Sequence, residues 1–92
     1  MKKFLIAGNW KMNKSIAEAK LFADQLKGEN IVHPEQLAVI APFTQLETLK
    51  RELDGTGIKV GAQNVHFEKS GAYTGEISAS MLKELDIDIC IV

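Results

Sequence analysis

Cysteine, basic charge and long apolar runs are all scarce in this chain. Cys90 is the single cysteine among 92 residues, so no disulfide can form within the chain. We expect Cys90 to be a small buried side chain in a reducing compartment, which indicates a cytoplasmic protein. The formal net charge of -1 offers no basic surface for nucleic acid. No apolar stretch is long enough to span a membrane.

Two hydrophobic periodicities alternate along the chain. Short, nearly continuous apolar runs predict strands buried on both faces, at residues 4–8, 37–41, 58–62 and 87–92. Between these runs, apolar residues recur at helical spacing behind Ser15, Thr44 and Ser78, each of which can cap a helix. Ser15 and Thr44 also have a glutamate three residues later, which is the capping-box pattern. The predicted apolar stripes comprise Ile16, Ala19, Phe22, Ala23 and Leu26; Leu46, Leu49 and Leu53; and Met81, Leu82 and Leu85.

The order strand, helix, strand, helix, strand, helix, strand predicts an α/β protein with a parallel sheet, in one domain over residues 1–92. The pattern alone allows an open doubly wound sheet or part of a (β/α)8 barrel. No Gly-x-Gly-x-x-Gly follows the first strand and no Walker phosphate loop is present. This disfavours a nucleotide-binding sheet but leaves a small flavodoxin-like binding domain as an alternative.

The first predicted strand ends in Asn9 and Lys11, two residues apart. In an extended segment both side chains would point to the same side and place an amide and an ammonium together. Such a pair suits a small anionic substrate. Spacing alone favours the simpler interpretation, in which Asn9 ends the strand and Lys11 is solvated, because such pairs are common.

Other polar residues give weaker signals. Gln63 and Asn64 follow the third strand, where they either cap the loop backbone or contact substrate. We expect His33 and His66 to be surface histidines, since neither has a partner at the spacing of a metal site or a catalytic triad. The acidic residues are scattered over helix faces, and we predict no metal site.

Four segments, in this order, resemble triosephosphate isomerases. They are residues 8–13 (GNWKMN), 41–44 (APFT), 61–64 (GAQN) and 71–78 (GAYTGEIS). The resemblance covers the whole chain and implies the N-terminal part of a (β/α)8 barrel, in the order β-α-β-α-β-α-β with parallel strands. Such barrels contain about 250 residues, so the resemblance implies a domain truncated after the fourth strand.

The resemblance also implies an activity. It is the interconversion of dihydroxyacetone phosphate and glyceraldehyde 3-phosphate by proton transfer through an enediolate, in glycolysis and gluconeogenesis and without a cofactor. By motif match, Asn9 and Lys11 bind the substrate. Lys11 is in addition the catalytic residue of this segment, because its charge neutralises the phosphate and the developing enediolate oxygen.

A homodimer interface is implied by the same resemblance. The residues concerned are Met12, Tyr73, Thr74, Gly75 and Glu76. Thr74, at the tip of the third loop, would reach into a partner subunit and support its Asn9–Lys11 region.

The catalytic histidine and glutamate of the family have no counterpart in these 92 residues, so we expect the chain alone to be inactive. Three helices would cover one face of the sheet and leave the other bare, which favours self-association. The alternative interpretation is a non-catalytic assembly module that self-associates or complements another chain.

Overall fold

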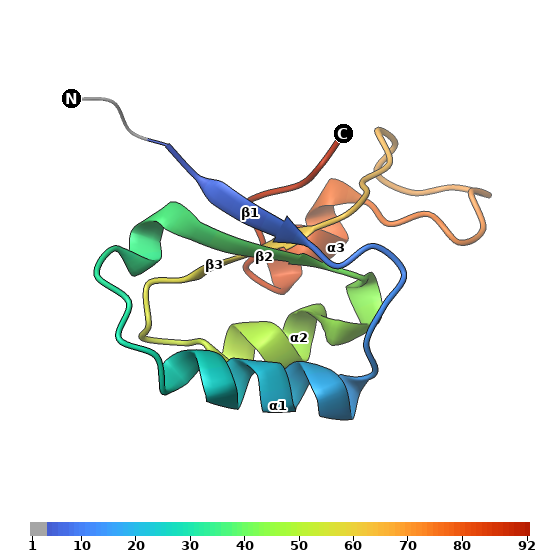
Figure 1. Ribbon diagram of the computed structural model, residues 1–92. Coiled ribbons are helices and arrows are strands. Elements are labelled where there is room, and N and C mark those ends of the chain that lie inside the picture. The colour runs from blue at the N-terminus through green and yellow to red at the C-terminus, as the bar shows by residue number, and fades with distance from the viewer. Residues whose placement is uncertain (1–3) are drawn as a thin grey trace.

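Three parallel strands form the sheet in the part of the chain that the structure describes (Figure 1). The computed structural model describes residues 4–92, so the first three residues of the expected 1–92 domain lie outside the described residues. The strands are β1 (Ile6–Asn9), β2 (Leu37–Ala41) and β3 (Lys59–Ala62), in the spatial order β1-β2-β3. The register joins Asn9 to Ile40 and Ala41 to Ala62, so the carboxyl ends of the strands lie at one edge.

The helices alternate with the strands, as the sequence predicts. Helices α1 (Ile16–Lys27) and α2 (Phe43–Glu52) lie side by side on one face of the sheet, and the short α3 (Ala79–Glu84) follows β3 (Figure 1). A 3-10 turn, η1 (Pro34–Gln36), leads into β2. None of the helices within residues 4–92 combines the length and the apolar character needed to cross a membrane.

Two of the three predicted helix caps are confirmed. Ser15 accepts a hydrogen bond from the Glu18 amide at 3.2 Å, and Glu18 accepts one from the Ser15 amide at 3.0 Å, which completes the capping box of α1. Ser78 likewise accepts from the amide of Met81 at 3.3 Å. The capping box at Thr44 is wrong. Helix α2 begins two residues earlier, at Phe43 behind Pro42, so Thr44 is already inside the helix.

The core lies between β2 and the two long helices. Four of the five residues of β2 are buried, which fits a strand with neighbours on both edges. The predicted stripe of α2 is confirmed, since Leu46, Leu49 and Leu53 are at most 2% exposed. In α1 only Ala19 and Ala23 are fully buried, and Ile16 at the first turn is 56% exposed.

Two predicted strands differ from the structure. β1 was expected over residues 4–8 and buried, yet it runs over Ile6–Asn9 and is exposed along its length. It pairs with β2 alone, so one edge has no hydrogen-bonding neighbour among the described residues. Residues 87–92 form no strand: Cys90 makes a single parallel bridge to Ala62 and is only partly buried. At this bridge the amide of Ala62 donates to the carbonyl oxygen of Ile89, and the carbonyl oxygen of Ala62 accepts from the amide of Ile91. The pairing does not extend further along residues 87–92.

The loop between β3 and α3 extends away from the sheet, as Figure 1 shows. Its base is closed by a bridge between His66 and Ser78. Residues 67–76 are all exposed and contain no helix or strand.

Candidate functional site

The candidate site begins where β1 ends. The amide of Trp10 still donates to the carbonyl of Ile40 at 2.9 Å, and the chain then turns sharply at Lys11, whose φ is 56°. Lys11 is therefore left-handed, and the prediction that Asn9 and Lys11 lie in one extended segment is wrong. The two residues are nevertheless joined, because Asn9 Oδ1 accepts a hydrogen bond from the Lys11 amide at 3.0 Å.

Gln63, the residue after β3, completes this arrangement. Its Nε2 donates to the carbonyl oxygen of Lys11 at 2.6 Å and lies 3.4 Å from Asn9 Oδ1. The carboxyl ends of parallel strands meet at the same edge of a sheet, which brings residues 54 positions apart together. The sequence left Gln63 undecided between capping a loop and contacting substrate. Gln63 follows a predicted strand of the same parallel sheet as Asn9, and this placement is the feature of the sequence that indicates a contact between them. Asn64, its neighbour, is exposed.

This network of Asn9, Lys11 and Gln63, which we call the loop-1 site, holds a strained backbone in place. A left-handed conformation costs a residue with a side chain about 1–2 kcal/mol, so it persists only where contacts support it. The Lys11 residue is exposed and forms no ion pair within residues 4–92. Its ammonium is thus free to meet an anion, and the side-chain NH2 group of Asn9 can act as a hydrogen-bond donor.

The loop-1 site can bind an anion and stabilise its negative charge. In the described part of the chain, no carboxylate or imidazole hydrogen-bonds to Asn9, Lys11 or Gln63. A proton transfer at carbon needs an acid or base within hydrogen-bonding reach of the substrate. The loop-1 site therefore supplies stabilisation of an anion and no group that moves a proton.

The residues assigned to a dimer interface all lie on the surface. Met12 follows Lys11 directly and is 95% exposed. The loop after β3 carries the others, Tyr73, Thr74, Gly75 and Glu76, and all are exposed. Gly75 has a φ of 86°, which only glycine adopts readily, so the tip of this loop turns where the sequence places a glycine.

The two histidines differ from each other in the structure. His33 is exposed as predicted and lies 3.2 Å from Glu35. The prediction for His66 is wrong: its ring packs between Phe67 and Tyr73, with centroids 4.6 and 4.3 Å away. His66 Nδ1 lies 3.9 Å from Glu76. No group of three potential metal ligands occurs among residues 4–92.

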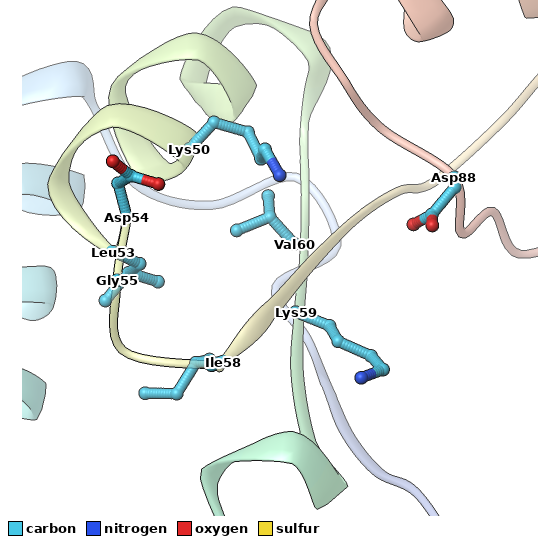
Figure 2. Close-up of a pocket in the computed structure, with 9 residues that line it drawn as sticks. Lys50, Leu53, Asp54, Gly55, Ile58, Lys59, Val60 and Asp88 are labelled. Carbon is cyan, nitrogen blue, oxygen red and sulfur yellow. The ribbon is translucent and has the colours of Figure 1, made fainter.

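A cavity lies at the opposite end of β3 from Gln63 (Figure 2). Two lysines and two aspartates contribute to its lining, so it has no excess of either charge; these are Lys50, Lys59, Asp54 and Asp88. Lys50 and Asp88 face it from opposite sides in Figure 2. Functional groups in a barrel of parallel strands gather at the carboxyl ends, so the loop-1 site is the better candidate.

Comparison with known proteins finds relatives that match nearly the whole chain. The family model described as triosephosphate isomerase matches residues 4–92. The chain is 49% identical to the triosephosphate isomerase of Finegoldia magna and 46% identical to that of Alkaliphilus metalliredigens. Each match covers all of this chain and 37% of the relative. It is also 50% identical over 91 residues to the L-erythrulose-1-phosphate isomerase of Brucella abortus, covering 97% of this chain and 36% of that protein.

The chain thus spans little more than a third of the length of the curated relatives it matches. The family model nevertheless covers nearly every residue, and the observed order of parallel strands and helices fits the first part of a (β/α)8 barrel. On these grounds, the chain belongs to the triosephosphate isomerase family.

Proposed function

We propose that this chain is the substrate-binding part of an isomerase that interconverts dihydroxyacetone phosphate and glyceraldehyde 3-phosphate, in glycolysis and gluconeogenesis. The observation that carries the proposal is the loop-1 site, in which Asn9 and Gln63 hold the backbone of Lys11. Membership of the family supports the reaction.

Each residue of the site has a defined part in the proposed chemistry. Lys11 is the catalytic residue: its ammonium neutralises the phosphate group of the substrate and the enediolate oxygen that develops when a proton leaves carbon. Asn9 orients the substrate through its amide group. Gln63 fixes the Lys11 carbonyl. No cofactor or metal takes part in the proposed reaction.

The 92-residue polypeptide is expected to bind the substrate and not to turn it over. Binding residues without a general base cannot transfer a proton at carbon. We expect no activity above background in a coupled isomerase assay of the polypeptide, purified from a host without its own isomerase. Turnover that disappears in the variant Lys11→Met, but persists in the matched surface variant Lys20→Met, would contradict this expectation.

L-erythrulose 1-phosphate is a second candidate substrate. The relative that carries this name is as similar to the chain as those named for triose phosphates. Both names denote a small sugar with a phosphate group, which is the part of the substrate that Lys11 would bind. Parallel titrations with the two phosphate esters test this candidate, and tighter binding of the four-carbon ester would favour it.

We further propose that the protein is a homodimer of the cytoplasm. The exposed loop residues Tyr73 to Glu76 and the exposed Met12 support a contact with a second copy. The single free cysteine, Cys90, agrees with a reducing compartment. In the alternative interpretation, a non-catalytic assembly module, these surfaces would serve assembly only. A phosphate ester would then not bind at Lys11, and this distinguishes the two functions.

A further inference from the structure

A second strained lysine lies at the other end of the loop that carries Lys11. Lys14 has a φ of 75°. Its ammonium lies 5.4 Å from the ring centroid of Trp10 and 5.7 Å from that of Phe22, which are themselves packed edge to face at 5.1 Å. Trp10 directly precedes Lys11. The placement of Lys14 therefore bears on the placement of Lys11 through one short, contiguous set of contacts.

Gln45 holds the backbone of Lys14. It lies in the first turn of α2, is 5% exposed, and donates from Nε2 to the carbonyl oxygen of Lys14. The hydroxyl of Thr44 donates to Gln45 Oε1 at 2.6 Å. A carbonyl oxygen can only accept, so the amide must present its NH2 group to Lys14, and Thr44 occupies its other end. Both ends of this buried side chain are thus hydrogen-bonded.

Gln45 is also fixed relative to the rest of the site. Helix α2 follows β2 after Pro42 alone. β2 pairs directly with β1 up to Asn9 and then accepts from the amide of Trp10. The donor on Gln45 and the strand that carries Asn9 therefore belong to one rigid unit, and the loop between them is attached to it at both ends.

We propose that Gln45 is a positioning residue for Lys11, acting through the carbonyl of Lys14; this inference rests on the proposed function. Gln63 fixes the loop at Lys11, and Gln45 fixes it at Lys14. Without Gln45 the left-handed Lys14 loses its hydrogen-bond donor. The loop then samples other conformations, and the backbone amide of Lys11 spends less time hydrogen-bonded to Asn9.

Two variants of Gln45 test the proposal, with hydrogen exchange of single amides as the readout. Gln45→Met keeps the length of the side chain and removes the donor. Gln45→Glu keeps the shape and turns an acceptor toward the Lys14 carbonyl at neutral pH. We expect the Lys11 amide to exchange about three- to tenfold faster in Gln45→Met, the effect of one lost hydrogen bond, and faster still in Gln45→Glu.

Two controls separate positioning from general stability. The amide of Ala62, which donates to the carbonyl oxygen of Ile89, is expected to keep its rate in both variants. Gln25→Met, at an exposed position of α1, is expected to change neither amide. Equal acceleration at Lys11 and Ala62, or no change at Lys11, would overturn the proposal.

A measurement on the unmodified chain does not depend on any variant folding. The side-chain NH2 of Gln45 is expected to show nuclear Overhauser contacts to backbone protons of Lys14 and Ser15. Their absence would overturn the proposal.

Titration with inorganic phosphate, followed at the side-chain signal of Lys11, tests the link to function. We expect the affinity for phosphate to fall at least about threefold in Gln45→Met, because the loop that carries Lys11 has lost one hydrogen bond. If the phosphate affinity of Gln45→Met is unchanged while its Lys11 amide exchanges faster, the proposal that Gln45 positions Lys11 is overturned. The proposed function is not affected by that result. Failure of the unmodified chain to bind phosphate would contradict the proposed function. The exchange rates would still decide whether Gln45 holds the loop.

Discussion

Single side chains at the edge of the sheet decide how the loop-1 site is built. Asn9, Gln63 and Gln45 each direct a polar group to the backbone of the loop that carries Lys11. The motif at Asn9 and Lys11 is visible in the sequence because the two residues are close along the chain. Gln45 and Gln63 are 31 and 52 positions from the residues they hold, and local spacing carries no information on such contacts.

Gly61 shows how closely the strands approach each other at the residue scale. A Cβ at this position would lie 2.5 Å from Cδ1 of Ile40 and 3.2 Å from the backbone oxygen of Ile89. The tip of Ile40 can rotate away, but the Ile89 oxygen accepts a hydrogen bond from Ala62 and cannot move freely. We expect Gly61→Ala to lower the free energy of unfolding by about 1–3 kcal/mol, as overpacking does.

Urea unfolding of this variant beside Gly8→Ala checks the prediction. A Cβ on Gly8 would meet no atom within 4 Å, so that variant is expected to be neutral or slightly stabilised. Equal stability of the two variants would contradict the account of Gly61.

At the scale of elements, helices were predicted better than strands. The stripe of α2 and the caps of α1 and α3 follow from spacing within each helix, and they are confirmed. The start of α2 was missed because Pro42 sets its first turn. A strand depends on neighbours that lie elsewhere in the chain. Within residues 4–92, β2 has two neighbouring strands and is buried, β1 has one and is exposed, and residues 87–92 make a single bridge.

The cap of α1 gives this helix a measurable pH dependence. Hydrogen bonds from the Ser15 backbone and then from its side chain hold the pKa of Glu18 below its ordinary value. Ionised Glu18 therefore stabilises the folded chain at a pH above the ordinary carboxyl pKa of about 4.3, and this contribution is lost as the pH falls through the lower pKa of the folded state.

Two variants separate the parts of this cap. Ser15→Ala is expected to destabilise the chain by about 1 kcal/mol at neutral pH, the usual effect of losing an N-cap. Glu18→Gln keeps the capping box but cannot titrate, so its stability should change less than that of the unmodified chain between pH 5 and 3 (an interval of about two units around the ordinary carboxyl pKa). Urea unfolding across this range checks both, and an identical acid dependence of Glu18→Gln would contradict the assignment.

At the scale of the whole molecule, the apolar surface along β1 stands out. Phe4, Leu5 and Ile6 are 45–60% exposed, and one edge of β1 has no strand beside it within residues 4–92. Such an edge with apolar side chains favours pairing with another chain. We expect the 92-residue polypeptide to associate, with a sedimentation coefficient that rises with concentration.

Variants on the two candidate surfaces show which one mediates association. Ile6→Glu places a charge on β1, and Thr74→Arg places one on the loop after β3. The equally exposed Leu21 on α1 provides the control variant Leu21→Glu. Loss of association in Ile6→Glu alone would indicate pairing through β1, and loss in Thr74→Arg alone would support the proposed dimer loop. A monomer at all concentrations in the unmodified chain would contradict the expectation.

The central claim is that Lys11 binds the phosphate group of a small phosphorylated sugar, and one titration tests it most directly. Dihydroxyacetone phosphate is added to the chain with isotopically labelled lysine side chains, and each lysine signal is followed by NMR. The account predicts a saturable shift at Lys11 that exceeds the shift at exposed lysines such as Lys20 and is absent in Lys11→Met. No saturable shift at Lys11, or equal shifts at all lysines, would contradict it.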